Sequence, residues 1–424
     1  MNLKRKDFIK LGALAVTVGA IPGFSSCSAP NDSKESTTTL ASLTADTKPI
    51  SKAERESRIE KAQQLLAKNN MAALVLDCGT SLEYFTGVSW WPSERTMVAI
   101  IPAKGSVKYI CPAFEEDRLR EQITNGNDVY VWQEDESPYR LIVNVLKDAG
   151  IQTGTVGMDE RLRYFILDGI QKEAPQLVYV SGDPISVECR IIKSEAEIAL
   201  MQKANNITLA AIQHGVAQLK EGMSQGELSS IIMRAQRDLG GDPDFALCLF
   251  GKDAAFPHGT KTPAKLKKGE IVLMDCGCRV HGYSSDITRT IVFGAEPTAR
   301  QLSVWNLEKE AQAAGFAAAK NGSPCGDIDA ASRKVITDAG FGPGYKLPGL
   351  PHRTGHGIGM DGHEWGNALK GNKRLLEPGM CFSIEPMIAI PGEFGIRLED
   401  CVHMTTDGPK WFSKTSKSLQ EPFG

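Results

Sequence analysis

Five separated side chains suited to metal binding constrain this chain more than any other feature. Four carboxylates and one imidazole lie within its last 150 residues, at Asp275, Asp286, His356, Glu385 and Glu399. Hard carboxylate oxygens with one imidazole nitrogen suit a pair of divalent cations, which together activate a water molecule. The fold must therefore bring five distant segments to one point, and the pattern indicates a hydrolytic site with two metals.

Length and charge limit the class of protein. The chain has 424 residues, of which 42% are hydrophobic, so it is long enough for two domains with sizeable cores. It carries 48 basic and 51 acidic residues, a formal charge of −3. Beyond the N-terminus no basic block occurs, and this balance gives no electrostatic footprint for nucleic acid.

The first 27 residues have the form of an export signal. Basic residues at 4–6 and 10 precede an apolar run from Leu11 to Phe24, which is too short to cross a bilayer as a mature helix. The run ends in Phe24-Ser25-Ser26-Cys27, which resembles a lipoprotein cleavage box, and residues 5–10 resemble a twin-arginine motif. We expect an exported protein of the cell envelope or periplasm, lipid-anchored through Cys27, with an uncleaved N-terminus as the alternative.

Residues 28–50 are rich in Ser, Thr, Ala and Pro, and we expect them to form a flexible tether. Residues 51–184 alternate short β-rich runs with amphipathic stretches and predict an α/β domain. Ser51-Lys52-Ala53-Glu54 has the form of a capping box that opens a helix ending near Lys68. The remaining pattern predicts strands at 73–76, 97–101, 107–110, 129–132 and 177–180, and helices near 115–123, 138–149 and 161–173.

A second domain is expected over residues 185–424. Capping boxes at Ser194, Ser224 and Thr298 each open a helix, the first extending to about Lys220, and a further helix is expected near Asp327. The apolar run 271–274 predicts a buried strand that delivers Asp275 at its end, and alternation over 285–293 predicts an antiparallel neighbour that carries Asp286. Two adjacent carboxylates repel unless a cation lies between them.

Cysteine usage gives no disulfide framework. Apart from Cys27 there are nine cysteines, an odd number, in apolar or glycine-rich contexts, and we expect buried thiols. Cys276 and Cys278 lack the C-x-x-C spacing of a metal or redox site, so packing is the favoured interpretation.

Taken singly, each acidic candidate is more often a turn or cap residue, but six motifs occur together. These are Phe256-Pro257-His258-Gly259, Met274-Asp275-Cys276-Gly277, Ser285-Asp286-Ile287-Thr288-Arg289-Thr290, the segment 355–364, Ser383-Ile384-Glu385-Pro386 and Ile396-Arg397-Leu398-Glu399-Asp400. In order and spacing they resemble the pita-bread metallopeptidases, and the preceding region resembles their creatinase-type N-terminal domain. The resemblance implies an α/β (α+β) chain whose C-terminal domain has a curved antiparallel sheet covered by helices.

The resemblance also implies roles for individual residues. Asp275 would bind one metal, Asp286 and Glu399 would bridge both, and His356 with Glu385 would complete the second. A bridging water would attack the peptide carbonyl while Glu385 shuttles the proton. His258, His352 and His363 match positions that bind the substrate carbonyl and stabilise the oxyanion. Arg397 is expected to orient the ligand carboxylates, and a purely structural ion pair remains its alternative.

His352, four residues before His356, resembles the arrangement in Xaa-Pro aminopeptidases and prolidases. We therefore expect an aminopeptidase that removes Xaa from peptides with proline second, using two divalent ions, with manganese favoured over cobalt, zinc or iron. An Xaa-Pro dipeptidase, a non-peptidase hydrolase or lyase on the same scaffold, and a non-catalytic binding protein remain alternatives. We expect a homodimer or higher homo-oligomer, with Trp90-Trp91-Pro92 as the loop that reaches a partner's site; a core tryptophan is the alternative.

Overall fold

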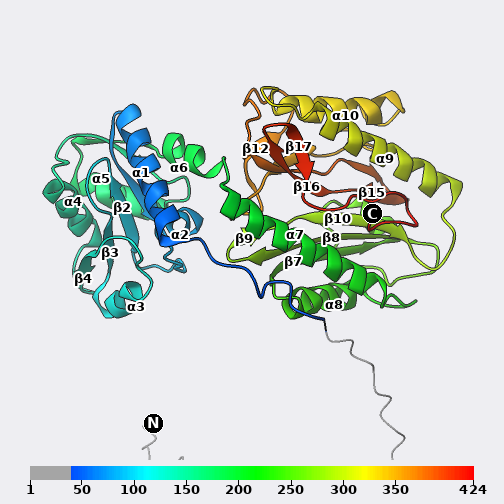
Figure 1. Cartoon of the computed structure of the whole chain (residues 1–424), viewed down its shortest axis with the longest axis horizontal. Helices are drawn as coiled ribbons and strands as arrows, with labels where there is room; N and C mark the ends of the chain where they lie inside the picture. The colour runs from blue at the N-terminus through cyan, green and yellow to red at the C-terminus, as the bar shows by residue number, and fades with distance from the viewer. Residues whose placement is uncertain (1–39) are drawn as a thin grey trace, which may run out of the picture. The chain divides into compact units, whose positions relative to one another are not determined.

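The computed structural model describes residues 40–424, which form one compact unit (Figure 1). The predicted export signal at 1–27, with Cys27, and the first part of the tether lie outside the described residues. Residues 40–50 lie against helices of the C-terminal domain. The Leu43 amide donates to the Leu239 carbonyl at 2.9 Å, and the Lys203 ammonium donates to Asp46 at 2.7 Å.

The N-terminal domain, here the elements α1 to α6, contains one six-stranded mixed sheet in the order β4-β3-β2-β1-β5-β6. Its strands are β1 (Met71–Asp77), β2 (Val98–Pro102), β3 (Lys108–Pro112), β4 (Asp128–Trp132), β5 (Gly154–Met158) and β6 (Leu177–Ser181). Its helices are α1 (Lys52–Lys68), α2 (Thr80–Thr86), η1 (Ala113–Glu115), α3 (Glu116–Arg120), α4 (Pro138–Asp148), α5 (Tyr164–Glu173) and α6 (Asp183–Arg190). The predicted α/β domain is confirmed.

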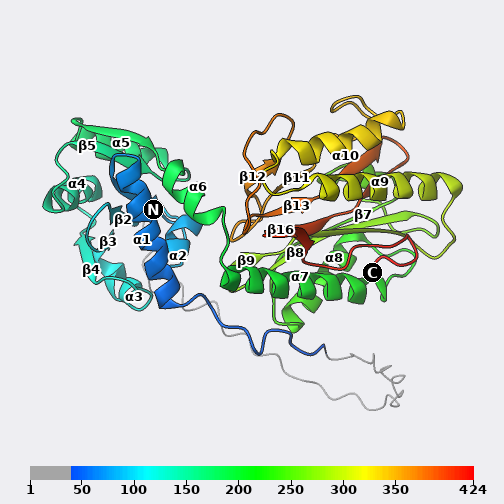
Figure 2. The same cartoon turned by 45° about the horizontal axis from the view of Figure 1, so that its top comes forward.

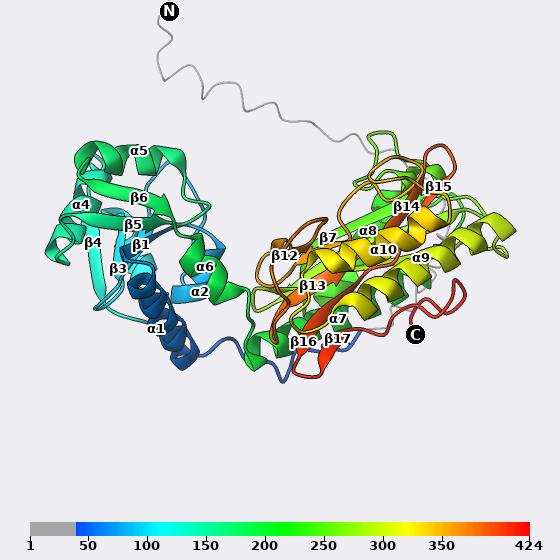
Figure 3. The same ribbon diagram turned by 90° about the horizontal axis from the view of Figure 1, so that it is seen from above.

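Alternation along β1 divides the core of this domain between two helical layers. Leu74 and Leu76 pack in one apolar cluster with α1 and α2, while Ala73 and Val75 pack in another with α4 and α5. Successive strand residues point to opposite faces, so a strand buried on both sides reads as a continuous apolar run. Figure 3 shows α4 and α5 on one side of the sheet and α1 on the other.

The C-terminal domain is built on antiparallel sheets, in the orders β10-β8-β7, β12-β11-β13-β16-β17 and β14-β15. The strands are β7 (Asp242–Phe250), β8 (Ile271–Val280), β9 (Tyr283–Ser284), β10 (Ile287–Val292), β11 (Gly355–Gly357), β12 (Glu364–Ala368), β13 (Cys381–Ile384), β14 (Met387–Ile390), β15 (Phe394–Arg397), β16 (Asp400–Thr405) and β17 (Gly408–Trp411). The helices are α7 (Glu195–Val216), α8 (Gln225–Asp238), η2 (Gly251–Ala255), α9 (Ala299–Ala318) and α10 (Gly326–Asp338).

Helices cover these sheets as expected from the family resemblance. Helix α7 packs on β8 and α8 packs on β7, while α9 and α10 lie side by side on β12 to β15 (Figure 2). The capping boxes at Ser194, Ser224 and Thr298 are each complete. Within residues 40–424 all nine cysteines are buried free thiols, as predicted.

One predicted capping box is only half formed, because its carboxylate serves another contact. Ser51 accepts from the Glu54 amide at 3.1 Å, but the Glu54 carboxylate accepts from Arg58 at 2.8 Å and from the Ser194 hydroxyl at 2.7 Å. Arg58 of α1 also lies 3.4 Å from Glu197 of α7, and both side chains are buried. The Tyr283 hydroxyl donates to Glu197 at 2.9 Å. A buried ionic cluster therefore joins the two domains.

Glu197→Ala should destabilise the protein by about 3–5 kcal/mol, because it removes a buried carboxylate from the ionic cluster. The Tyr283 hydroxyl then loses its acceptor, and Arg58 keeps Glu54 as its carboxylate partner. Denaturant unfolding measures the change. Glu227→Ala is the matched control, since Glu227 completes the same type of capping box on α8 but is exposed. Equal losses for the two variants would show that the ionic cluster contributes no more than a helix cap.

Candidate active site

The first half of the site is carried by paired strands β8 and β10. Asp275 is the fifth residue of ten in β8, so the prediction that it ends a strand is wrong. The strand continues through Cys276-Gly277-Cys278 because it stays paired with β7 there, and the Thr208 hydroxyl of α7 donates to the Cys278 thiol at 3.3 Å. Asp286 directly precedes β10, whose Thr288 is the register partner of Asp275.

The second half comes from the segments around β13 and β15. Glu385 follows β13, and its amide donates to the Thr354 carbonyl at 2.7 Å. Glu399 lies between β15 and β16 and forms an isolated antiparallel bridge with Thr288. The Thr288 hydroxyl donates to Glu399 Oε2 at 2.7 Å. Thr288 therefore connects both halves of the site.

His356 lies in the middle of β11, where two glycines allow the backbone to approach closely. A Cβ on Gly355 would lie 2.0 Å from the Ser383 carbonyl oxygen, and one on Gly357 would lie 1.6 Å from that of Trp365. The Nδ1 atom of His356 lies 3.1 Å from the Gly357 carbonyl, which places the proton on Nδ1. Its Nε2 atom then turns a lone pair toward Glu385, 3.2 Å away, and Asp286, 3.6 Å away.

The five predicted ligands converge, and their electrostatics fit divalent cations. Overlapping triads bring one ligand atom of each member within 4.8 Å of the others: Asp275, Asp286 and Glu399; His356, Glu385 and Glu399; and Asp286, His356 and His363. One buried oxygen each of Asp275, Asp286 and Glu399 has no hydrogen-bond partner among residues 40–424. Buried carboxylate oxygens left without donors beside a histidine lone pair are a ligand set that a cation would satisfy.

Burial and mutual repulsion shift the protonation of these ligands. Burial, with the nearby carboxylates, raises the pKa values of Asp286 and Glu399 well above their ordinary range. Burial likewise raises the pKa of Glu385 to about 7, although Arg397 opposes this shift. Burial lowers the pKa of His356 to about 3, so its imidazole is neutral and available as a ligand at pH 7.

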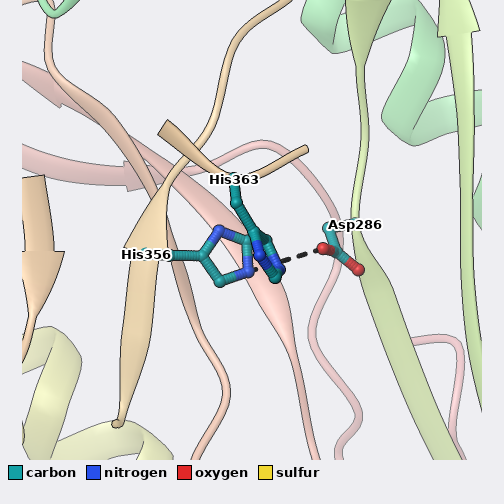
Figure 4. A group of neighbouring side chains, drawn as sticks. All are labelled: Asp286, His356 and His363. Atoms are coloured by element: carbon teal, nitrogen blue, oxygen red, sulfur yellow. Dashed lines mark ion pairs between the residues drawn. The ribbon is translucent and has the colours of Figure 1, made fainter. Parts of the chain in front are cut away.

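The three further histidines surround this cluster. The His363 ring centroid lies 4.0 Å from that of His356, and Figure 4 shows both rings beside Asp286. His352 is partly buried; burial and Arg397 lower its pKa to about 4, so it is neutral at pH 7. His352 Nε2 has no partner within the described residues. His258 is exposed and lines both cavities of the site together with His363.

Arg397 is the cation that balances the carboxylates. Its Nη2 donates to Asp275 Oδ2, and its Nε donates to the Thr288 hydroxyl at 3.1 Å and lies 4.0 Å from Glu399. Arg397 is 3% exposed. It therefore fixes one oxygen of Asp275 and leaves the other free.

Two cavities meet at the cluster. One, of about 470 Å³, contains the five ligands and is also lined by Arg161 and Asp361. The other, of about 730 Å³, is lined by charged and imidazole side chains on one side and by the apolar side chains of Phe256, Tyr345 and Leu369. They share His258, His363, Glu385 and Arg397.

Sequence reasoning missed several lining residues. Arg161 belongs to the N-terminal domain and lies in no recognised motif. Arg353 lines the second cavity, and its position directly after His352 could have identified it from the sequence. Trp90 packs partly buried against the core, and Trp91 is 83% exposed. Neither tryptophan is among the residues of 40–424 that line these two cavities.

Known proteins resemble nearly the whole described chain. An Xaa-Pro dipeptidase of Lactobacillus helveticus is 32% identical over 367 residues, a match that covers 85% of this chain and 98% of that protein. The crystal structure of dipeptidase PepE from Mycobacterium ulcerans matches with a TM-score of 0.81 and 28% identity, covering 88% and 99% of the two chains. A prolidase from Thermococcus sibiricus matches with a TM-score of 0.78 and 29% identity, covering 85% and 97%.

These comparisons correct the predicted location. The matches to the dipeptidase from Lactobacillus helveticus and the prolidase from Thermococcus sibiricus cover 98% and 97% of those chains, and neither relative supports the predicted export. The prediction of an envelope or periplasmic protein, lipid-anchored through Cys27, is therefore wrong. Residues 40–424 contain no helix that is both long and apolar enough to cross a membrane.

Two family descriptions divide the matched region between the two domains. Residues 58–192 match the creatinase/prolidase N-terminal domain, and residues 199–406 match metallopeptidase family M24. The fold expected from the resemblance, an α/β N-terminal domain followed by a pita-bread domain, is confirmed. With its fold, its carboxylate cluster and its relatives in agreement, the chain belongs to metallopeptidase family M24 and is an enzyme of that family.

Proposed function

We propose that this enzyme is an Xaa-Pro dipeptidase with two divalent metal ions. The observation that carries the proposal is the convergence of four carboxylates and His356 at the junction of two cavities, with buried oxygens that lack donors. The substrate class follows the relatives, since the matched proteins include an Xaa-Pro dipeptidase and a prolidase. This changes the order of the alternatives from the sequence, which favoured an aminopeptidase.

Asp275, Asp286, His356, Glu385 and Glu399 would hold the two ions, and manganese is the expected metal because oxygen ligands dominate. Bound divalent cations would polarise the substrate carbonyl and lower the pKa of an attacking water. Arg397 positions Asp275 through their ion pair and so keeps its second oxygen free. The roles proposed below belong to side chains of this chain, so they are the same for any of these metals.

Glu385 would transfer the proton. It lines both cavities, and its carboxylate would accept a proton from the attacking water and pass it to the leaving nitrogen. Neutral His352 and His363 would orient the substrate carbonyl and donate to the developing oxyanion, with His258 at the mouth of both cavities.

The second cavity suits the proline residue of the substrate. A proline nitrogen carries no N–H and its ring fixes φ, so an Xaa-Pro bond requires a site shaped for the ring rather than for a donor. Phe256, Tyr345 and Leu369 supply apolar walls beside the shared residues. Arg353 lies at the same cavity and supplies a positive charge for the C-terminal carboxylate of a dipeptide.

One observation favours an Xaa-Pro aminopeptidase as the second candidate. Phe256, Tyr345 and Leu369 are 51%, 48% and 39% exposed, so the second cavity opens to solvent beyond the proline position. An open cavity leaves room for residues that follow proline.

We also propose a homodimer in which exposed Trp91 contacts the partner subunit, which sedimentation of the Trp91→Ala variant would test.

Metal-dependent release of Xaa from an Xaa-Pro dipeptide, but not from Xaa-Ala, is the expected result for the metal-loaded protein, measured by mass spectrometry. An Xaa-Pro-Yaa tripeptide distinguishes the candidates: its cleavage at a comparable rate would establish the aminopeptidase. Cleavage of none of the peptides would reject both and favour a non-peptide reaction on this scaffold.

Asp286→Asn should lose both bound metal and turnover, with kcat reduced by about 100-fold or more, because a ligand charge shared by the cluster disappears. Elemental analysis and initial rates measure the two effects. Asp242→Asn, at the exposed start of β7, is the control for removal of one negative charge. Full metal content in Asp286→Asn would contradict the ligand assignment.

Metal binding to chelator-treated protein should strengthen between pH 6 and pH 8. Below about pH 7 the Glu385 carboxyl holds a proton, which a cation must displace, so affinity falls about tenfold per pH unit for each displaced proton. Without metal, the same proton stabilises the fold below the ordinary pKa of 4.5, and this stability is lost as pH rises through about 7. Calorimetric titration with Mn²⁺ in buffers of different ionisation enthalpy measures both affinity and proton release; equal affinity at both pH values would contradict the expectation.

A further inference from the structure

His363 depends on its loop for its position. It lies just before β12, and within residues 40–424 its ring forms no hydrogen bond, although it contacts the His356 ring at 4.0 Å. The loop is closed by Glu364, whose Oε1 accepts from the amides of Met360 at 3.1 Å and Asp361 at 3.2 Å. A Cβ on Gly359 would lie 2.6 Å from the Glu364 carboxylate, so the turn has no spare room. The backbone that precedes His363 is therefore held by the Glu364 carboxylate.

The Asp361 carboxylate ties this loop to the N-terminal domain. Its Oδ2 accepts from Arg190 Nη2 at 2.7 Å, and its Oδ1 accepts from the Thr80 hydroxyl at 2.7 Å and from Arg161 Nη1 at 3.1 Å. These three donors come from three separate segments of the N-terminal domain. Three donors on two oxygens, two of them charged, restrict the movement of the Asp361 carboxylate.

Glu364 anchors the other side. Its Oε1 accepts from Arg190 at 2.6 Å and its Oε2 from Lys193 at 2.8 Å, and all three side chains are 2% exposed. Burial alone would raise the pKa of Glu364, but Lys193 and Arg190 lower it to about 2, so it is ionised at pH 7. Arg190 thus bridges Asp361 and Glu364, the residues on either side of Gly362-His363.

We propose that Asp361 is a positioning residue that holds His363 beside the metal-binding side chains by fastening its loop to Thr80, Arg161 and Arg190. The inference rests on the proposed function, because it assigns His363 to substrate binding. Through its contacts with Asp361, the N-terminal domain would then affect the rate of catalysis as well as the selection of substrate length. Removing Asp361 leaves buried Arg190 paired with Glu364 at 2.6 Å, and Arg161 is 50% exposed, so no buried charge loses its last partner.

A double-mutant cycle with an Xaa-Pro dipeptide tests the proposal. Wild type, Asp361→Ala, His363→Ala and the double variant are compared after loading with metal. Asp361→Ala should lower kcat about 10- to 100-fold with a smaller change in KM, because a misplaced His363 weakens transition-state contacts. In the His363→Ala background the same change should add less than about twofold. Independent, multiplicative losses would overturn the proposal.

Glu54→Ala is the matched control. Glu54 also accepts from donors on both domains, Arg58 at 2.8 Å and Ser194 at 2.7 Å, and its side chain is 21% exposed. It lies in the other interdomain cluster, so its loss should lower thermal stability without changing kcat. An equal fall in kcat for both variants would mean that loosened domains, rather than the His363 loop, limit turnover, and would reject the assignment.

A second readout does not depend on activity. The chain has seven histidines, so ¹³Cε1 signals of labelled, zinc-loaded protein are few, and the signal lost in His363→Ala identifies that ring. Asp361→Ala should shift or broaden this signal, whereas Glu54→Ala should not. An unchanged His363 signal would overturn the proposal even if the wild type cleaves Xaa-Pro bonds. If it cleaves none, the function fails while this measurement still decides the position of His363.

Discussion

Repulsion among four closely packed carboxylates is the constraint on which the rest of this structure depends. Burial, together with the neighbouring carboxylates, raises the pKa values of Asp286 and Glu399 well above their ordinary range. One internal cation, Arg397, offsets part of this charge, and the remainder suits two dications. Holding such a cluster together requires a rigid support, which the paired strands and the Thr288 bridge provide.

Two ionic clusters cross the interface between the domains, one around Arg58 and Glu197 and one around Arg190 and Glu364. Desolvating these charges costs free energy, so their value lies less in stability than in defining one arrangement of the buried surfaces. The second cluster borders the cavity of the metal ligands, which makes the joint part of the site rather than a remote linker.

The two cavities divide the chemistry of the site. The smaller cavity contains the predicted ligands, whereas the larger one adds the apolar side chains of Phe256, Tyr345 and Leu369, which are exposed at its mouth. The shared residues His258, His363, Glu385 and Arg397 stand where a scissile bond would lie between them. Under the proposed function, the open end of the larger cavity would decide whether residues beyond proline fit.

Much of this molecule could be predicted from local sequence signals. The caps at Ser194, Ser224 and Thr298 and the apolar strand runs depend on neighbours within a few residues, so the sequence alone determined these elements. The candidates Asp275, Asp286, His356, Glu385 and Glu399 were found because each lies in a short motif. What local signals missed was how far β8 extends past Asp275, because strand pairing with β7 and β10 sets its length.

Only the tertiary structure decided the contacts that join distant segments. Glu54 was expected to complete a cap, but Arg58 and Ser194 offer it charged and hydroxyl donors that the helix end does not. Arg161 and Asp361 are 200 residues apart and meet only because the domains pack together. The physical reason is range: a cap or strand run is fixed by adjacent residues, whereas an ion pair across a domain joint exists only after both surfaces are folded and desolvated.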